Sequence, residues 1–557
     1  MRRWLSFVCC LVLAGCSSSG GGATTSGDDA TPGDDAPTSG DDATSDAPVP
    51  ASVCTVAAKG TAGVAVRGRV LAPSGPLDGE VLVDATGKIT CVAASCAATA
   101  GYAQATQLAC PGGVIAPGFV NAHDHTDYDV TTPVSDGKTR YDHRNGWRKG
   151  TGGATPIKQP TPTTDPNLLA AAELRFVMGG ATSIVGSGGT QGFLRNLASF
   201  KNPGWMEGLT GKTVYFDTFP LGDSGGVELT SGCAYPSIRT ASSAFADGAY
   251  APHIAEGVNL AAENELTCLT SATTNLVQAQ TAVIHAVGLN ARDVDVLARS
   301  KAKVVWSPRS NIDLYGNTAS VTVLKNAGVT VALGTDWLAS GSMNVLRELK
   351  CADDLNQRYF AKAFSDQELF AMATHNAAVA AAFDTQIGDL APGLVGDVVV
   401  YDGRVNKDYR AAIDGGAEDV HLVVRGGKPL YGDADLVGAL ASTCAALDVC
   451  GTARLVCVDV PSVTLASIQT AVAASYPLFF CKAQAPTAEP SCVPYRDTYP
   501  NGTSATDRDG DGVDDAKDDC PDVFNPARPM DNGVQSDVDG DGFGDACDAK
   551  PLDKSAH

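Results

Sequence analysis

The sequence predicts an α/β protein: a TIM-type (β/α)8 barrel, a small β sandwich made of segments before and after it, and a calcium-binding tail. Apolar strand-like runs alternate with helical stretches through the middle of the chain, as in parallel barrels. Short strands joined by turns flank this region on both sides. Aspartates recur at alternate positions in 507–511 and again in 537–541.

The chain of 557 residues is long enough for a large core with accessory segments. Changes of composition predict seven parts along it. These are a signal peptide (1–16), a disordered tether (17–51), the first part of the sandwich (52–116), the barrel (117–384), the second part of the sandwich (385–435), a cysteine-containing extension (436–500) and the calcium repeats (501–557).

The N-terminus predicts export. Two arginines precede an apolar run, residues 4–13, that is too short to span a bilayer. The run ends in Leu13-Ala14-Gly15-Cys16, which resembles a bacterial lipoprotein box and implies cleavage before Cys16 and its lipidation. Ser17 favours an outer-membrane or cell-surface destination over the inner membrane. An ordinary secretory signal and a cytosolic start are the alternatives.

Cysteine content and charge agree with that prediction. Of 17 cysteines, two leave with the signal and one carries lipid, so 14 remain, an even number typical of disulfide-bearing exported proteins. The net charge of −23 comes largely from the tether and the tail, so it indicates no nucleic-acid partner. The expected partners are a small-molecule substrate and, through the lipid, a membrane. Local disulfides are expected between Cys91 and either Cys96 or Cys110, and between Cys520 and Cys547.

The predicted strands divide between sandwich and barrel. Sandwich strands are expected at 65–71, 79–84, 87–92, 397–402 and 420–427. The first barrel strand follows the apolar run 114–116, and later ones are expected at 181–186, 213–219, 250–255, 282–287, 303–307 and 330–335. The eighth strand should fall between Phe219 and Ala249. Residues 131–164 form a long loop, which is typical of a functional lid.

Metal-binding residue types stand at the ends of these strands. His123 and His125 are two apart, so on a strand both side chains share one face, which at the mouth of a barrel looks into the active site. His253, with Glu256 three residues on, ends a later strand, and His285 and Asp336 end two more. Imidazoles and a carboxylate converging there predict a site for a transition metal.

These motifs resemble the amidohydrolase superfamily, nearest its aminohydrolase branch of cytosine deaminase, guanine deaminase and triazine hydrolases. The resemblance runs from about Gly60 to Gly427 and rests on PGFVNAHDH (117–125), HIAEG (253–257), SPRSN (307–311), LGTDW (333–337) and IGDLAPGLVGD (387–397). It implies that His123, His125, His253 and Asp336 bind one divalent metal, zinc or iron. Glu256, His285 and Asp336 would be catalytic. No lysine stands at a motif position suited to a carbamate bridge, which favours one metal over two.

Other candidates carry weaker signals. Asn311 and Trp337 are expected to bind substrate, with Glu348 a weaker candidate. His143 lies in the long loop and is expected to be structural, although its neighbours Arg144, Trp147 and Arg148 could grip an anionic or aromatic group.

The tail carries a repeat of 30 residues that resembles thrombospondin type 3 repeats. Carboxylates at alternate positions followed by Gly512 and Gly542 match the first half of a calcium loop. The aspartates would repel one another without metal, so folding should depend on calcium. The predicted calcium ligands are Asp507, Asp509, Asp511, Asp514, Asp537, Asp539, Asp541 and Asp545.

Together these observations predict an exported metal-dependent hydrolase that attacks carbon–nitrogen bonds other than peptide bonds and deaminates an aminated heterocycle. Hydrolysis of a cyclic amide in the same site is the alternative reaction. A calcium-binding surface or adhesion protein with a catalytically inactive barrel is the alternative of another class. The sequence gives no prediction of oligomeric state.

Overall fold

The computed structural model describes residues 52–135, 137–198, 203–271 and 273–557. The predicted signal peptide, with Cys16, and the tether therefore lie outside the described residues. Within the described part of the chain, every helix is too short or too polar to cross a bilayer.

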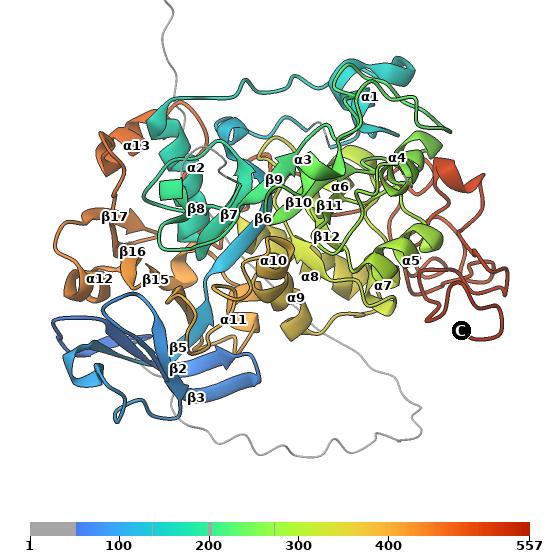
Figure 1. Cartoon of the computed structure of the whole chain (residues 1–557). Helices are drawn as coiled ribbons and strands as arrows, with labels where there is room; N and C mark the ends of the chain where they lie inside the picture. The colour runs from blue at the N-terminus through green and yellow to red at the C-terminus, as the bar shows by residue number, and fades with distance from the viewer. Residues whose placement is uncertain (1–51, 136, 199–202, 272) are drawn as a thin grey trace, which may run out of the picture. The chain divides into compact units, whose positions relative to one another are not determined.

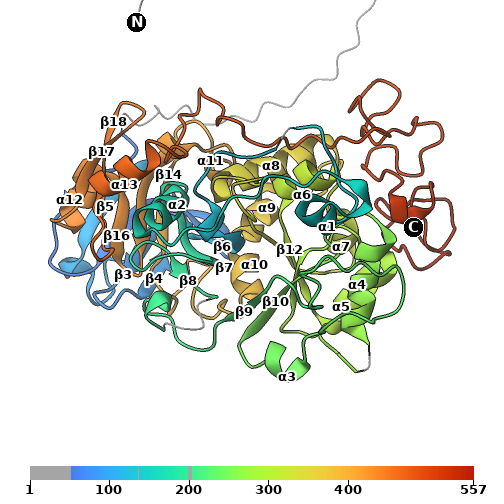
Figure 2. The same ribbon diagram turned by 90° about the horizontal axis from the view of Figure 1, so that it is seen from above.

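Eight strands run in parallel and close into a TIM-type barrel (Figures 1 and 2). Val214 N donates to Leu197 O (2.8 Å), which continues the ring from β8 to β9. A parallel bridge between Asp124 and Asp336 joins the last strand to the first. The barrel strands are β6 (Phe119–His125), β7 (Ala181–Ser187), β8 (Arg195–Asn196), β9 (Val214–Asp217), β10 (Ala249–Ile254), β11 (Ala282–His285), β12 (Lys303–Trp306) and β13 (Val331–Leu333).

The prediction for the eighth strand was wrong. It lies at β8, between β7 and β9, and not between Phe219 and Ala249. β8 is only two residues long, so it leaves no apolar run for a pattern to detect. Residues 219–249 form instead a loop with one short helix, α3 (Ala241–Ala244), and the disulfide from Cys233 to Cys268 fastens that loop to the barrel.

Capping residues start the helices that surround the barrel. Asp165 accepts a hydrogen bond from Asn167 N at the start of α2 (Pro166–Met178). Asparagines cap α4, α5 and α8 in the same way. The helices that follow α2 and α3 in the barrel region are α4 (Leu260–Thr270), α5 (Ala291–Ser300), α6 (Pro308–Tyr315), α7 (Val321–Asn326), α8 (Val345–Arg358), α9 (Asp366–Met372) and α10 (His375–Ala380).

The segments on either side of the barrel join in one sheet. β14 pairs antiparallel with β5, so residues far apart in the sequence lie side by side, as predicted. Hydrogen bonds connect ten strands into a single sheet that continues past residue 435, which differs from the predicted sandwich. Val66, Val81, Val398 and Val424 share one hydrophobic cluster. The strands are β1 (Thr55–Ala58), β2 (Val64–Ala72), β3 (Gly75–Val83), β4 (Ile89–Ala93), β5 (Thr106–Pro117), β14 (Val398–Asp402), β15 (Val420–Arg425), β16 (Lys428–Asp433), β17 (Ala445–Val449) and β18 (Thr452–Val456).

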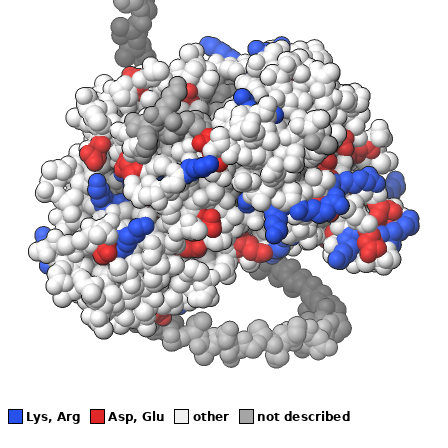
Figure 3. All heavy atoms as spheres, in the orientation of Figure 1, with Lys and Arg blue, Asp and Glu red and all other residues white. Residues whose placement is uncertain are grey.

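Apart from β17 and β18, the C-terminal region has little regular structure besides α12 (Ala434–Leu440), α13 (Leu465–Val472) and one short 3₁₀ turn, Pro529–Asp531. Disulfides and aspartate-rich turns stabilise it. On the face drawn in Figure 3, acidic and basic side chains are interspersed at the right, where the tail lies in Figure 1. The seven disulfides among the described residues are Cys54–Cys110, Cys91–Cys96, Cys233–Cys268, Cys351–Cys492, Cys444–Cys457, Cys450–Cys481 and Cys520–Cys547.

Candidate metal centre and active site

The five strand-end residues selected from the sequence meet at one mouth of the barrel. The ligand atoms of His123, His125 and Asp336 all lie within 4.8 Å of one another, and so do those of His123, His253 and His285. His123 Nε2 lies 3.2 Å from Asp336 Oδ1, and His125 Nε2 lies 3.8 Å from the same oxygen. β6, β10, β11 and the end of β13 therefore converge on one point, as the barrel topology requires.

The hydrogen bonds of His125 and His253 leave an unprotonated Nε2 atom on each ring, and these two atoms face each other. His253 Nδ1 contacts the carbonyl oxygen of Asp217 (3.1 Å), which can only accept, so the ring proton lies on Nδ1. Ser187 donates its hydroxyl proton to Asp127, so its oxygen accepts from His125 Nδ1 at 3.3 Å. Both Nε2 atoms are then unprotonated, and they lie 3.3 Å apart. Two lone pairs at that distance repel each other unless a cation lies between them, so these residues fit a metal.

Burial keeps the imidazoles neutral, as a metal ligand must be. Desolvation lowers the pKa of His123 to about 3, and desolvation together with the neighbouring His123 lowers the pKa of His125 to about 3. Desolvation also holds the pKa of His253 far below its usual value. Neutral imidazoles with one carboxylate are the donors that zinc prefers, and imidazole also suits iron.

Backbone strain accompanies two of the predicted catalytic residues. His285 and Asp336 have φ angles of +74° and +66°, in the left-handed region that non-glycine residues rarely adopt. Such conformations persist where the surroundings over-determine them. Ser310 donates to Asp336 Oδ2, and Ser340 lies 2.8 Å from Ser310, so hydroxyls hold the carboxylate from behind.

The carboxyl of Glu256 lies beside the same cluster of ligand atoms, and its pKa is close to neutral pH. Burial raises the pKa of Glu256 to about 7, against the lowering effect of Arg144. Its Oε1 accepts a hydrogen bond from the Tyr315 hydroxyl (2.7 Å), and its Oε2 lies 3.7 Å from His285 Nε2. A carboxyl with a pKa close to the working pH can both accept and donate a proton.

A cavity of about 380 Å³ opens beside these groups. Trp337, predicted to bind substrate, lines it, whereas Asn311 contacts His285 Nδ1 (3.2 Å) and orients that ring. Glu348 bonds to the backbone N–H of Arg309 and is not among the lining residues. The walls are His125, Asp127, Tyr128, Arg144, Trp147, Arg148, Gln159, Ser187, Thr218, Phe219, His253, Glu256, His285, Asp336 and Trp337.

The long loop contributes to this cavity through α1 (Arg144–Lys149). Arg144 is buried and makes ion pairs with Asp223, Glu256 and Glu265. Because its charge is already neutralised inside the protein, it is poorly placed to grip an anion. The Arg148 guanidinium instead stacks on the Phe219 ring, 4.3 Å from its centroid, at the cavity wall.

His143 occupies a structural position, in line with its prediction. Its Nε2 lies 3.2 Å from Glu265 Oε1, and its Nδ1 lies 3.4 Å from Glu228 Oε1. These carboxylates raise the pKa of His143 to about 9, despite the opposing effect of burial. Through His143, two carboxylates therefore fasten the loop to the barrel wall.

Sequence reasoning missed several residues around the site. Tyr315 and Ser310, which hold Glu256 and Asp336, occupy helix α6, which begins inside the SPRSN segment. Asp223, Glu228 and Glu265 reach the site only through tertiary structure, and no local pattern marks them. The position of α6 after a barrel strand is the one signal that could have indicated its two residues.

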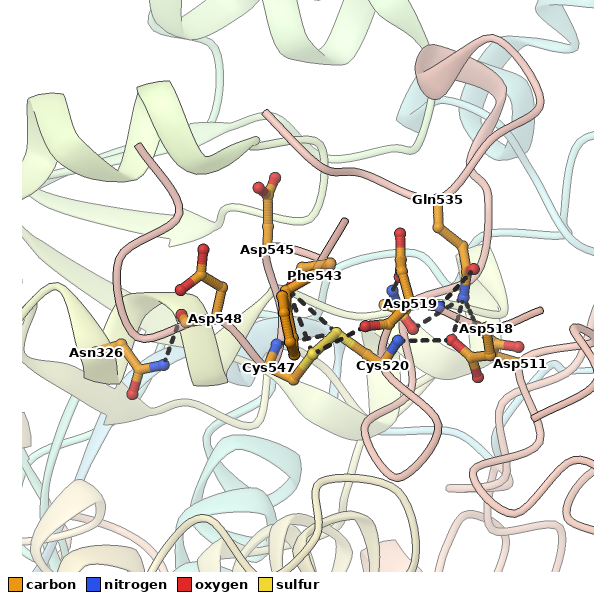
Figure 4. Close-up of a disulfide and its surroundings, with 12 residues drawn as sticks. Asn326, Asp511, Asp518, Asp519, Cys520, Gln535, Phe543, Asp545, Cys547 and Asp548 are labelled. Atoms are coloured by element: carbon orange, nitrogen blue, oxygen red, sulfur yellow. Dashed lines mark hydrogen bonds between the residues drawn. A yellow bond between two sulfur atoms is a disulfide. The ribbon is translucent and has the colours of Figure 1, made fainter. Parts of the chain in front are cut away.

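The tail gathers a different set of donors. Ligand oxygens of Asp507, Asp509 and Asp511 lie within 4.8 Å of one another, as do those of Asp537, Asp539 and Asp541. Burial, together with the neighbouring Asp511 and Asp518, raises the pKa of Asp509 to about 8. Figure 4 shows the Cys520–Cys547 disulfide between residues of the two loops, with Gln535 bonded to Asp511 and Asp518 of the first.

Two further aspartates, outside the predicted set, belong to the same stretches. Asp518 and Asp548 stand eleven residues after Asp507 and Asp537, at the last position of a 12-residue calcium loop. Each has a buried Oδ2 without a hydrogen-bond partner, and so has Asp509. The predicted ligand Asp545 accepts bonds from Ser536 and Val538 with its two oxygens. The 12-residue spacing makes Asp518 and Asp548 further candidate donors beside the predicted aspartates.

Comparisons with known proteins match part of the chain. Residues 250–430 match the model of the Amidohydrolase family. A 5-methylthioadenosine/S-adenosylhomocysteine deaminase of Teredinibacter turnerae is 37% identical over 122 residues, which are 21% of this chain and 28% of that protein. A 5'-deoxyadenosine deaminase of Methanothermobacter thermautotrophicus is 32% identical over 167 residues, 28% of this chain and 39% of that protein. The matched stretches thus span less than half the length of these relatives.

Solved structures with similar folds were also found. An adenosine deaminase from Xanthomonas campestris with bound zinc is 18% identical, covers 67% of this chain and 93% of its own, and gives a TM-score of 0.47. E. coli guanine deaminase is 18% identical, covers 66% of this chain and 99% of its own, with a TM-score of 0.46. The family match and the deaminase relatives support the amidohydrolase superfamily for this chain.

Proposed function

We propose that the protein is a metal-dependent hydrolase that deaminates an aminated heterocycle. The observation that carries this proposal is the pair of bare Nε2 atoms of His125 and His253, 3.3 Å apart, beside Asp336 and Glu256. Deaminase relatives and the Amidohydrolase match support hydrolysis of carbon–nitrogen bonds other than peptide bonds.

His123, His125, His253 and Asp336 would hold one divalent metal, zinc or iron. Such an ion supplies Lewis acidity, which lowers the pKa of water toward about 7. The protein excludes bulk water from the site, since His123 is fully buried and His253 and Asp336 are nearly so. Asp336 Oδ1, the oxygen nearest the two β6 histidines, is placed to accept the proton of the attacking water.

Glu256 would carry that proton to the leaving nitrogen. The pKa of about 7 means that the carboxyl is partly protonated at neutral pH, so donation to an amine and regeneration both cost little. His285, held by Asn311, lies 3.7 Å from Glu256 Oε2 and faces the cavity, where it can polarise the carbon under attack. Loss of ammonia from the tetrahedral carbon completes the reaction.

The cavity favours a flat aromatic substrate. Trp337, Trp147 and Phe219 form apolar walls, against which a flat aromatic ring can pack. The relatives are named as deaminases of 5-methylthioadenosine, S-adenosylhomocysteine and 5'-deoxyadenosine, so adenine-bearing nucleosides are the first substrates to test. Hydrolysis of a cyclic amide is the second candidate, because the same water and the same proton carrier could open such a ring.

Metal content and turnover test the proposal together. We expect about one zinc or iron per chain in the isolated protein, lost in His123→Ala, and ammonia release from at least one adenine nucleoside. Cyclic amides assayed in parallel would distinguish the second reaction. Failure to bind a transition metal after reconstitution would contradict the proposal and leave a calcium-binding surface protein with an inactive barrel.

We further propose that the two aspartate loops bind calcium. Their support is the set of unpartnered buried oxygens on Asp509, Asp518 and Asp548 and the close approach of the other carboxylates. Calorimetric titration of the intact protein should detect sites that magnesium fills poorly, because Mg²⁺ requires a stricter octahedral geometry. Asp518→Asn should weaken one site and leave the other.

Export as a lipoprotein anchored through Cys16 is proposed as well. The 14 cysteines of the described residues all form disulfides, which supports folding in an oxidising compartment. Labelled palmitate should enter the protein expressed in a Gram-negative host and fail to enter Cys16→Ala. Equal labelling of both would contradict the anchor.

A further inference from the structure

The C-terminal extension reaches the helix that carries Tyr315. Arg496 Nη1 donates to the carbonyl oxygens of Tyr315 (2.8 Å) and Tyr141 (3.3 Å), and Nη2 forms an ion pair with Asp142. Tyr499 donates its hydroxyl to Gly316 O (3.2 Å). One arginine of the extension therefore joins the C-terminal end of α6 to the base of the long loop, residues 140–143.

Both of these elements hold Glu256. Tyr315 donates to Glu256 Oε1 (2.7 Å), and Trp147 of the loop donates its ring N–H to the Tyr315 oxygen (2.8 Å). The loop backbone also pairs directly with this region, because Arg144 N donates to Glu256 O at 2.9 Å. A shift of either element would move the carboxyl that we assign to proton transfer.

A second segment of the tail reaches the loops after β10 and β11. Arg528 Nη1 donates to the carbonyl oxygens of Val287 (3.2 Å) and Leu289 (2.9 Å), just after His285. Met530 N donates to Val258 O (3.1 Å), two residues after Glu256. Arg528 is 7% exposed, so its charge is fixed inside this interface by its ion pair with Asp531.

The segment that carries Arg496 and Tyr499 is itself packed firmly against the tail and the barrel helices. The Tyr499 ring is 2% exposed and packs edge-on to Phe524, 5.5 Å between centroids. Gly512 of the first aspartate loop lies so close to Thr498 that an added Cβ would come within 2.4 Å of its carbonyl oxygen. The disulfide between Cys351 and Cys492 joins the extension to α8.

We propose that Arg496 and Arg528 are positioning residues for the active site, so that the C-terminal region is part of the catalytic domain. Arg496 acts through Tyr315 and the loop base on Glu256, and Arg528 acts through the backbone after His285. The proposal rests on the deaminase function proposed above. Small misplacements of a catalytic group cost large factors in rate: about 1 Å can cost 10²-fold.

The test compares arginine variants of the full-length protein with a matched control. Arg496→Ala and Arg528→Ala should each lower kcat by about 10-fold or more, with the bound transition metal retained. The control is Arg410→Ala, which removes ion pairs with Asp353 and Asp366. The Arg410 side chain is 26% exposed, against 18% for Arg496, and it contacts neither of these loops. This control should leave kcat unchanged. Equal kcat losses in all three variants would indicate a general structural effect and overturn the proposal.

A double-mutant cycle tests the route through Tyr315. If Arg496 acts through that hydroxyl, Arg496→Ala should have little further effect on kcat in a Tyr315→Phe background. If the two substitutions lower kcat by independent factors that multiply, Arg496 does not act through the Tyr315 hydroxyl. Hydrogen exchange gives a readout that does not need turnover: residues 141–149 and 308–316 should exchange faster in Arg496→Ala and not in Arg410→Ala.

The two readouts separate this inference from the proposed function. If the wild-type protein deaminates no substrate but Arg496→Ala still increases hydrogen exchange in residues 141–149 and 308–316, the deaminase proposal fails. The structural role of the Arg496 contacts then stands. If turnover is found and neither arginine variant changes kcat or exchange, the positioning role fails and the deaminase proposal stands.

Discussion

Two regions of the chain gather metal-binding side chains, and they do so in opposite ways. In the barrel, His123 and Asp336 approach each other to 3.2 Å although 213 residues separate them. In the tail, each set of three clustered aspartates comes from a stretch of five residues. The barrel site depends on eight strands closing into a ring, whereas each tail loop depends on its own turn.

The electrostatics differ as well. Buried barrel imidazoles stay neutral without metal, because desolvation lowers their pKa values, so the barrel can fold before the ion binds. The tail carboxylates repel one another, and the pKa of Asp509 is raised to about 8. We infer that the barrel centre is preformed and that the tail loops depend on their ion to fold.

The largest effect is expected for a barrel ligand. His253→Ala should abolish the bound transition metal and lower turnover by more than about 10³-fold, while the far-ultraviolet circular dichroism stays that of the wild type. Mass spectrometry of metal content and ammonia release measure the two effects. His375→Ala, at a half-exposed histidine paired with Asp389, is the control and should retain both. Unfolding of His253→Ala would contradict a preformed site.

Glu256→Gln should separate metal binding from proton transfer. The amide is isosteric but cannot carry a proton, so kcat should fall by about 10²–10⁴-fold. Metal content should stay at the wild-type level, because Glu256 lies outside the proposed ligand set. Loss of the metal in this variant would assign Glu256 to the metal shell and contradict its role as proton carrier.

Sequence patterns predicted the barrel centre better than its surroundings. His123, His125 and the strand-end residues are visible because strand periodicity and barrel topology together fix where their side chains point. Tyr315, Asp223 and Glu265 were not visible, since their roles depend on packing between elements distant in sequence. The strand β8 was not predicted, because a strand of two residues is too short to show a periodic pattern.

The tail shows the converse. Its candidate loops were predicted from local spacing alone, and the structure adds Asp518 and Asp548, whose buried Oδ2 atoms have no hydrogen-bond partner, as further candidate donors. Its contacts with the active-site loops were not predicted at all. A local pattern specifies a local turn but not the surface against which that turn packs.

Removal of calcium should affect the tail far more than the barrel. A chelator selective for calcium over zinc should make residues 507–548 sensitive to protease and lower turnover about 10-fold through loss of the Arg496 and Arg528 contacts. The transition metal should remain bound, and added calcium should restore both properties. Asp518→Asn should mimic part of the effect, whereas Asp497→Asn, outside the loops, should not. Simultaneous loss of the barrel metal would contradict the independence of the two sites.

The smallest effect concerns the buried charge that fastens the long loop. The folded-state pKa of His143 is raised from 6.5 to about 9 by Glu228 and Glu265. Its stabilising contribution is therefore fully present below pH 6.5 and lost as pH rises through about 9. A rise of the pKa from 6.5 to about 9 corresponds to about 3 kcal/mol, so the free energy of unfolding of the wild type, measured with denaturant, should fall by up to that amount between pH 6.5 and 9.5. His143→Gln should flatten this pH dependence; an unchanged slope would mean that the loop is held by Arg144 alone.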